Sequence, residues 1–303
     1  MKNNGIYIDP STYRKSQILD DRIKIFDELP VFSMIELNLL ARCNRSCSFC
    51  PVSSETFYQD FYDGKLGKLE LDLYDKLLDD LSQINFSGLI AYSGLSEPLL
   101  HPKINHFIAR SKEVLVNARV EIVSNGDVLN KKRLNNLFIN GLDTISISLY
   151  DGPQQVEYFN KMQAELGLRA DQMILRRRYY LNGDYGLTIS NRAGLIDSNE
   201  FRSEKDKKVF KLPLRKSCFY PFYMLKIDYN GDVTICSHDW RKKGSVGNIK
   251  KEKIWDIWKG NALKLIRENL AKKYRNFSPC DECDVYGDLM GREHFDQWNK
   301  AVL

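Results

Sequence analysis

Three cysteines in one short run, Cys43, Cys47 and Cys50, constrain this chain more than any other feature. Their spacing, C-x3-C-x2-C, brings three thiolates into a single loop. That suits a cubane iron–sulfur cluster, because four irons with three protein ligands leave one iron open. A structural zinc site is the alternative, but it needs four ligands in paired halves, and no fourth Cys or His lies close to the run in the sequence. The run therefore predicts a cluster whose open iron is available for chemistry.

Length and charge narrow the class of protein. The chain has 303 residues, enough for one large domain and a small one. Its 45 basic and 40 acidic residues give a net charge of only +5, spread along the sequence, so we expect no nucleic-acid partner. No long apolar run or signal peptide is apparent, which predicts a cytoplasmic protein without a membrane partner. In a reducing compartment, seven cysteines are better metal ligands than disulfide partners.

Apolar runs alternate with amphipathic ones, which is typical of βα units in a parallel sheet. The expected strands are residues 34–39, 88–92, 120–124, 144–149, 173–178 and 187–190, and the expected helices are residues 71–84, 102–115, 131–139 and 154–166. Six such strands predict an α/β fold with a partial (β/α)6 barrel. In barrels of this kind the functional residues lie on loops at the C-terminal ends of the strands.

The cysteine run resembles the signature of the radical S-adenosylmethionine (SAM) superfamily, whose core is a partial (β/α)6 barrel. In that family an aromatic residue before the last cysteine, here Phe49, lies near the adenine of SAM. The resemblance implies that the open iron binds SAM and that reductive cleavage gives a 5′-deoxyadenosyl radical. It also implies an electron donor of the flavodoxin or ferredoxin type.

Three strand ends carry residues that the resemblance assigns to SAM. The segment 92–98 resembles the family's G-G-E-P motif, with Gly94 and Glu97 matching and Leu95 and Ser96 departing. The resemblance gives Glu97 the amino group of SAM, with Gly94 and Ser96 beside it, although an ordinary turn with a solvated acid would have the same sequence. The next strand ends in Ser124 and Asn125, at the place where the family binds the ribose, but Asn-Gly is also a common turn.

Polar residues on the later strands are candidates for the same site. Ser146 and Ser148 alternate with apolar residues and so share one face of their strand. If that face is the barrel interior, Ser148 reaches the ribose or the carboxylate of SAM, unless it merely fills the barrel. Three successive arginines, 176–178, must place at least one guanidinium inward, unless they lie beyond the strand end, and a buried guanidinium needs an anion. Arg192 is our preferred residue for the SAM carboxylate or an acidic substrate group.

The C-terminal third carries four further cysteines, Cys218, Cys236, Cys280 and Cys283, around an expected hairpin with an Asn-Gly turn. This arrangement resembles the short auxiliary-cluster domain called twitch, a relative of the SPASM domain, and its spacing is similar to that of aminocyclitol dehydrogenases. A zinc ribbon from the same four thiolates is the alternative. We expect an extension over residues 1–30, a radical SAM core over 31–197 and an auxiliary iron–sulfur domain over 198–303.

The cysteine count constrains the mechanism. Three ligands for one [4Fe-4S] cluster and four for another use all seven cysteines. A fully ligated second cluster can carry an electron but has no open iron for substrate. The sequence thus predicts a radical SAM oxidoreductase that abstracts a substrate hydrogen and passes an electron to the auxiliary cluster, dehydrogenating a sugar or aminocyclitol alcohol.

Two other functions stay open at this stage. One is modification of a ribosomal peptide, and the other is a non-catalytic electron carrier with two clusters. The aromatic segment 57–62 is either a cap over the site or a packed loop. Substrate identity, the choice among dehydrogenation, epimerisation and cross-linking, and the oligomeric state do not follow from the sequence.

Overall fold

The computed structural model describes residues 2–3, 6–7, 9–20, 23–54, 56–62, 66–183, 185–186, 189–202 and 207–301. Its strands are β1 (Lys2–Asn3), β2 (Ile6–Tyr7), β3 (Ile25–Phe26), β4 (Leu29–Pro30), β5 (Met34–Leu37), β6 (Leu89–Tyr92), β7 (Arg119–Ser124), β8 (Thr144–Leu149), β9 (Met173–Arg177), β10 (Met224–Ile227), β11 (Asp232–Thr234) and β12 (Ser245–Asn248). Its helices are α1 (Pro10–Asp20), α2 (Phe57–Tyr62), α3 (Leu71–Gln83), α4 (Ile104–Val114), α5 (Lys131–Ile139), α6 (Gln154–Glu165), α7 (Tyr220–Tyr223), α8 (Ile254–Lys259), α9 (Asn261–Ala271) and α10 (Arg292–Ala301). None of the described helices has both the length and the apolar composition needed to cross a membrane.

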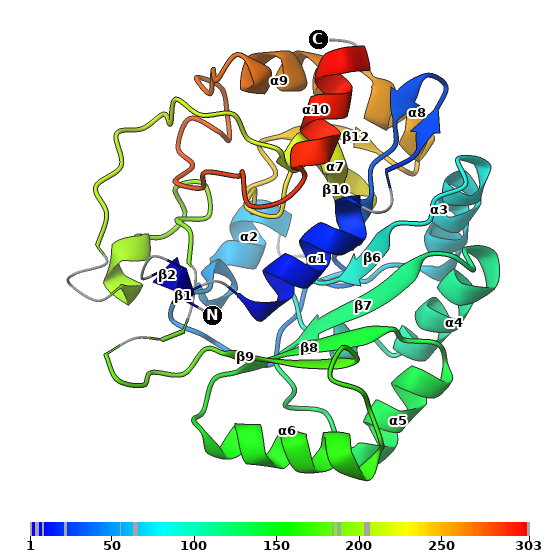
Figure 1. Ribbon diagram of the computed structural model, residues 1–303, viewed down its shortest axis with the longest axis vertical. Helices are drawn as coiled ribbons and strands as arrows, with labels where there is room; N and C mark the ends of the chain where they lie inside the picture. Colours follow the sequence, from blue (N-terminus) through cyan, green and yellow to red (C-terminus); the bar gives the residue numbers. More distant parts are fainter. Residues whose placement is uncertain are drawn as a thin grey trace.

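A single large sheet organises the chain, in the order β12-β11-β10-β5-β6-β7-β8-β9. Strands β5 to β9 run parallel, and each is joined to the next through one of the helices α3 to α6. These four helices lie along the outside of the curved sheet (Figure 1). The α/β fold class predicted from the alternating apolar runs is confirmed.

The first five predicted strands and all four predicted helices are present, with ends that differ by at most two residues. The sixth predicted strand is wrong where the structure tests it. Ile189 and Ser190 lie outside any strand, and residues 187 and 188 fall outside the described residues.

A sixth parallel strand comes instead from β10, which pairs with the free edge of β5. The sheet therefore continues past the expected boundary between residues 197 and 198. The expected hairpin is confirmed, because β10 pairs antiparallel with β11 through the turn at Asn230 and Gly231. The aromatic segment 57–62 forms helix α2, and its Phe57 is buried against Trp240.

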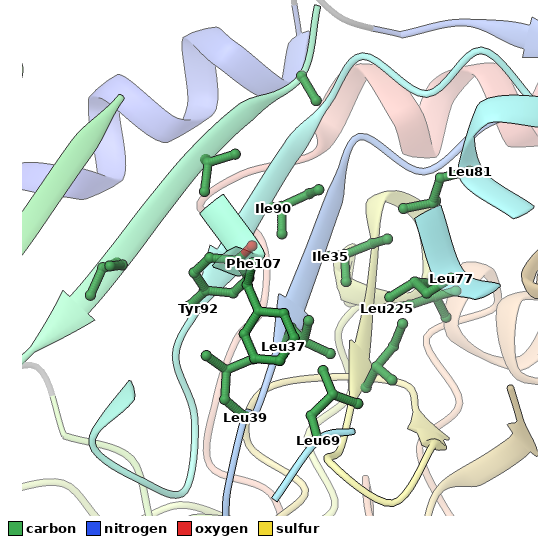
Figure 2. Packing of buried hydrophobic residues seen from close by; sticks show 14 of the residues in the cluster. Ile35, Leu37, Leu39, Leu69, Leu77, Leu81, Ile90, Tyr92, Phe107 and Leu225 are labelled. Carbon is green, nitrogen blue, oxygen red and sulfur yellow. The ribbon is translucent and has the colours of Figure 1, made fainter. Parts of the chain in front are cut away.

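The outer face of the sheet holds the main core. Ile35, Leu37 and Ile90 point toward α3 and α4, where they meet Leu77 and Phe107 (Figure 2). Each is at most 2 % exposed. Truncating a side chain of this kind to alanine typically costs about 2–5 kcal/mol of stability.

The inner face is polar by contrast, because side chains alternate between the faces of a strand. Glu36, Glu121, Ser146 and Lys226 all point inward, and each is at most 8 % exposed. Ser146 and Ser148 share this face, as the alternation predicted. The buried polar and charged side chains of this face need hydrogen-bond or ion-pair partners from other parts of the chain.

Helix α1 supplies some of those partners from the N-terminal extension. It lies across the inner side of the sheet (Figure 1), where Leu19 packs with Met34 and Ala91. Arg14 forms an ion pair with the buried Glu121 of β7. The extension is thus part of the fold.

Candidate functional site

The first cysteine group, Cys43, Cys47 and Cys50, lies in the loop that follows β5. A local turn shapes this loop, because the Cys50 backbone N–H donates to the Cys47 carbonyl at 2.9 Å. The thiols influence one another: burial, with the neighbouring Cys50, raises the pKa of Cys47 to about 11. Such thiols are neutral at pH 7 unless a metal binds them, and a bound metal deprotonates a coordinating thiol.

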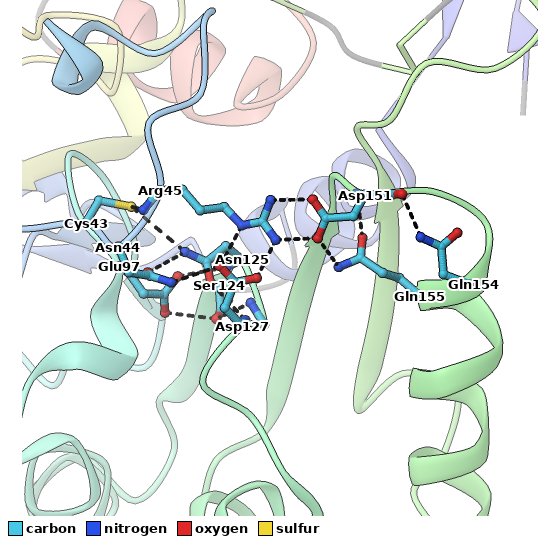
Figure 3. Close-up of polar contacts among 11 residues, drawn as sticks. Cys43, Asn44, Arg45, Glu97, Ser124, Asn125, Asp127, Asp151, Gln154 and Gln155 are labelled. Atoms are coloured by element: carbon cyan, nitrogen blue, oxygen red, sulfur yellow. Dashed lines mark hydrogen bonds and ion pairs between the residues drawn. The ribbon is translucent and has the colours of Figure 1, made fainter.

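The loops after β7 and β8 hold the cysteine loop in place (Figure 3). The Asn125 side chain donates to Asn44 Oδ1 at 2.8 Å and reaches Cys43 Sγ at 3.9 Å. Arg45 forms hydrogen bonds with Asp127 and Asp151, with Nε to Oδ2 at 2.7 Å and Nη1 to Oδ1 at 2.8 Å. These hydrogen bonds raise the pKa of Arg45 above its usual value. Three strand ends therefore meet at the first cysteine group.

The side chain of Glu97 accepts hydrogen bonds from residues of the loops that meet at the first cysteine group. Its carboxylate is 2 % exposed and accepts hydrogen bonds from Leu99 N at 3.0 Å, Ser124 Oγ at 2.9 Å and Asn125 N at 2.7 Å. Burial raises the pKa of Glu97, and these three donors oppose the shift. The Glu97 backbone N–H also donates to Arg42 O at 3.0 Å. The expected contact of Glu97 with the SAM amino group stays a prediction, and the structure shows that Glu97 ties three loops together.

Gly94 and Ser96 lie beside Asn38, which belongs to a second network of hydrogen bonds. Gly94 has a φ of +124° and lies against Asn38, so a side chain there would be strained. Ser96 Oγ donates to Asn38 Oδ1, and Asn38 Nδ2 donates to Asp228 Oδ1, both at 2.7 Å. The sequence analysis missed Asn38 and Asp228, because their partners are remote in the sequence.

Phe49 packs against other aromatic side chains, and its expected position near the SAM adenine stays a prediction. Its ring stacks on Tyr150 at 5.9 Å and meets Phe201 edge-on at 6.0 Å. Ser148 is buried, and it lies close enough to Tyr150 to oppose the rise that burial causes in the pKa of that hydroxyl. Ser146 is also buried, and its hydroxyl has no hydrogen-bond partner among the described residues.

Two of the three successive arginines, Arg176 in β9 and Arg178 just after it, are paired with a carboxylate of this chain. Arg176 and Arg178 both bind Asp9 of the N-terminal extension, with Arg176 Nε to Oδ2 at 2.6 Å. Burial opposes ionisation of Asp9, but the two guanidinium groups hold its pKa well below the usual value. The sequence analysis did not identify Asp9 as the partner of these arginines.

Arg192 takes a different position. Its backbone has a φ of +51°, and its guanidinium lies 4.9 Å from the centre of the Trp240 ring. Its buried Nε has no partner among the described residues. Burial lowers the pKa of Arg192, and the nearby Cys50 thiol and Glu36 oppose that shift. Arg192 is thus a partly buried cation near Cys50 of the first cysteine group.

The second cysteine group, Cys218, Cys236, Cys280 and Cys283, is gathered by the C-terminal part of the chain. Burial raises the pKa of Cys236 well above its usual value, and the other three thiols raise it further. None of the seven cysteines forms a disulfide. In the part of the chain that the structure describes, no three His, Cys, Asp or Glu side chains are close enough to share one metal ion. The thiolates of a cubane each bind a different iron and so stand further apart than ligands of a single ion.

Two residues of this region went unnoticed in the sequence. Arg275 is 2 % exposed and donates to four backbone carbonyls, those of Lys216, Ser217, Val285 and Tyr286, at 2.5–3.0 Å. It thereby joins the loops that carry the second cysteine group. Gly287 has a φ of +76°, and a Cβ there would lie 2.2 Å from Cys218 Sγ. Neither an isolated arginine nor a lone glycine gives a signal that sequence alone could interpret.

Comparison with known proteins agrees with this geometry. Residues 37–164 match the radical SAM superfamily, and residues 218–284 match the SPASM family, described as an iron-sulfur cluster-binding domain. An S-adenosyl-L-methionine-dependent 2-deoxy-scyllo-inosamine dehydrogenase from Niallia circulans is 28% identical over 255 residues, which cover 84% of this chain and 93% of that protein. The crystal structure of BtrN in complex with AdoMet and 2-DOIA matches with a TM-score of 0.69 and 25% identity, over 87% of this chain and 98% of BtrN. BtrN in an open conformation shares the fold, with a TM-score of 0.62, 24% identity and coverage of 88% and 98%.

The two matched segments contain the two cysteine groups, and the barrel-like sheet with its C-terminal cysteine domain has the architecture of a known SAM-binding protein. The cofactors that these two families imply are SAM, the cluster that binds it and an auxiliary iron–sulfur cluster. This protein is an oxidoreductase with a radical SAM domain over residues 37–164 and a SPASM domain over residues 218–284.

Proposed function

We propose that the protein dehydrogenates a secondary alcohol of a small polyol, a sugar or an aminocyclitol, to a ketone. The observation that carries this proposal is the similarity to a 2-deoxy-scyllo-inosamine dehydrogenase over 84% of the chain. When bound, the two clusters and SAM supply a 5′-deoxyadenosyl radical and an electron acceptor. The substrate carbon then loses a hydrogen atom, its hydroxyl loses a proton, and one electron leaves for the second cluster. Together these losses make a two-electron oxidation.

The residues around the first cysteine group fit the binding of SAM. We assign the first cluster to Cys43, Cys47 and Cys50, and the SAM adenine to the neighbourhood of Phe49. Ser124 and Asn125 are proposed for the ribose, with Ser148 on the same inner face. Gly94, Ser96 and Glu97 are proposed for the amino group. Arg192 is proposed for the carboxylate, because its buried Nε lacks a partner among the described residues.

The second cysteine group fits a fully ligated cluster. Its four thiols lie close enough to raise one another's pKa, as in Cys280, whose pKa rises through burial and the nearby Cys218 and Cys283. Arg275 joins the loops that carry them, and of the four only Cys280 is buried, while the other three are partly exposed. With four protein ligands, such a cluster exchanges electrons and does not bind substrate.

We assign the SAM chemistry to residues 31–197 and the auxiliary cluster to residues 198–303, with residues 1–30 as an extension. A flavodoxin- or ferredoxin-type protein is the proposed electron donor. A peptide substrate fits less well, because α1 covers part of the inner face on which a long substrate would have to lie.

The test uses anaerobically reconstituted protein with SAM, dithionite and 2-deoxy-scyllo-inosamine. We expect 5′-deoxyadenosine and a ketone product in equal amounts, measured by chromatography and mass spectrometry. The control is the triple variant with Cys43, Cys47 and Cys50 changed to Ala, which should form neither. Formation of 5′-deoxyadenosine without any ketone from a panel of cyclitols and sugars would refute the dehydrogenase proposal, while leaving the radical SAM chemistry in place.

A further inference from the structure

Two buried charges face each other on the inner side of the sheet, apart from the residues assigned to SAM. Glu36 of β5 and Lys226 of β10 are paired in the parallel register, and they are 8 % and 3 % exposed. Paired strands lie about 4.8 Å apart, and paired residues project to the same face. Lysine and glutamate are rarely buried unless something binds them.

Neither charge has a full set of hydrogen-bond partners among the described residues. Lys226 Nζ has no hydrogen-bond partner among the described residues. Of the ion pairs that the described residues form within 4.0 Å, none joins Lys226 to Glu36. Glu36 accepts one hydrogen bond, from Ser237 Oγ to Oε2 at 2.8 Å. A buried ammonium without acceptors is costly, so the site is built for something that brings them.

This pair lies between the two cysteine groups. Strand β5 leads at its C-terminal end into the first group, whereas α7, which precedes β10, follows Cys218 of the second. The electrostatics agree with this order. The charge of Glu36 influences the pKa of Arg192, which Cys50 also influences, and the pKa of Tyr220, which Cys218 also influences. A group bound at Glu36 and Lys226 would therefore have one cluster on each side.

The side chains around Glu36 and Lys226 are polar and aromatic. The ring of Trp240 lies 5.8 Å from Lys226 Nζ and 4.9 Å from the Arg192 guanidinium. His238 forms hydrogen bonds with Ser190 at 2.8 Å and with Tyr220 at 3.1 Å. Sugar-like rings commonly bind between an aromatic face and side chains that both donate and accept hydrogen bonds, because such rings have apolar C–H faces and polar edges.

The side facing α1 is partly closed. Lys15 of α1 lies near both Glu121 and Glu36, which favour its charged form, while burial lowers its pKa. Arg14 is already bound to Glu121. Because α1 lies against this side of the pair, a small molecule fits there better than an extended chain.

We propose that Lys226 and Glu36 bind the substrate, Lys226 donating to an oxygen on one ring carbon and Glu36 accepting from a hydroxyl or ammonium on a neighbouring one. This inference rests on the proposed function and narrows it to rings with adjacent polar substituents. It makes the two residues determinants of specificity for the alcohol that is oxidised.

The test is a binding measurement with the reconstituted holoprotein and SAM but no reductant, so that no turnover occurs. Anaerobic calorimetry compares three probes: 2-deoxy-scyllo-inosamine, scyllo-inositol, and cyclohexanol, which has the same ring but a single hydroxyl. The variants are Lys226→Met and Glu36→Gln, and the matched control is Lys251→Met, at an exposed position of the same domain. Iron content, SAM affinity and melting temperature verify that each variant is intact.

We expect both cyclitols to bind the wild type and cyclohexanol not to. Lys226→Met should weaken both cyclitols by about tenfold or more, because a hydrogen bond to a charged group is lost. Glu36→Gln should weaken the amine more than scyllo-inositol, because only the amine carries a positive charge. Lys251→Met should bind like the wild type.

If an intact Lys226→Met variant binds both cyclitols as tightly as the wild type does, the inference is overturned. It is also overturned if the SAM-loaded wild type binds neither cyclitol. Cyclitol binding that depends on Lys226, but without ketone formation once dithionite is added, would support the inference and refute the proposed dehydrogenation. The two failures are therefore distinguishable.

Discussion

Replacing Glu97 by Gln tests whether this carboxylate holds the loops of the site together. In the wild type, Oε1 accepts from Leu99 N and Ser124 Oγ, and Oε2 accepts from Asn125 N. The carbonyl oxygen of a glutamine can replace Oε1, but its NH2 group would face the Asn125 N–H. One buried donor would then have no acceptor, which costs about 1–3 kcal/mol.

The opposing effect is the removal of a buried charge. Burial raises the pKa of Glu97, so the ionised carboxylate is itself disfavoured there, and a neutral side chain recovers part of the loss. We therefore expect a net destabilisation of about 1–2 kcal/mol. For a protein of this size such a loss lowers the melting temperature by about 1.5–3 °C.

The assay is anaerobic thermal unfolding of the reconstituted protein, together with SAM affinity and iron content. Ser124→Ala, which removes one donor to the same carboxylate, is the matched control and should also lower the melting temperature. If Glu97 contacts the SAM amino group as well, Glu97→Gln should weaken SAM by roughly 1.5–3 kcal/mol while both clusters remain. An unchanged melting temperature in Glu97→Gln would refute the structural role argued here.

Three further predictions concern the extension and the second cysteine group. Asp9→Asn should lower stability at pH 7 by about 2 kcal/mol, since Asp9 is only partly exposed and binds two arginines. Because the pKa of Asp9 is depressed in the folded protein, the wild type should have its full advantage in melting temperature above about pH 4. That advantage should shrink as the pH falls further. Gly287→Ala should reduce reconstituted iron from about eight to about four per chain, because its Cβ would collide with a cysteine Sγ, whereas Gly183→Ala, with a similar φ of +86° but nothing within 4 Å, should keep all of it. Changing both Cys280 and Cys283 to Ala should still allow SAM cleavage to 5′-deoxyadenosine but abolish the ketone; full ketone formation by a folded variant would show that the electron leaves by another route.

The parts of the site that follow from the sequence are those whose geometry is local. The spacing of Cys43, Cys47 and Cys50 fixes three thiols in one loop. The alternation of Ser146 and Ser148 with apolar residues fixes their common face. The polar residues after β6 and β7 meet because the C-terminal ends of parallel strands share one edge of a sheet. Each of these predictions depends on neighbours in the chain or on a general property of the fold.

The parts that sequence reasoning missed depend on partners far apart in the chain. Asp9 satisfies Arg176 and Arg178 across more than 160 residues, and a single acidic residue near the N-terminus gives no sign of this. The pairing of β10 with β5 was missed for the same reason. One signal was available: residues 223–227 are mostly apolar, which is typical of a strand buried on both faces, and a hairpin at the edge of a small domain would not need that.

The shared strand pair explains how two cysteine groups from distant parts of the chain acquire a fixed separation. Strand β5 ends at the loop of Cys43, while β10 begins just after Cys218, and the two strands run parallel. The groups therefore lie toward opposite ends of a pair four residues long, which spans roughly 13 Å at about 3.3 Å per residue. Glu36 and Lys226 occupy the middle of that span on the inner face. A hinge between two independent domains would let this distance vary, whereas a continuous hydrogen-bonded ladder keeps the substrate position, the radical source and the electron acceptor in one rigid frame.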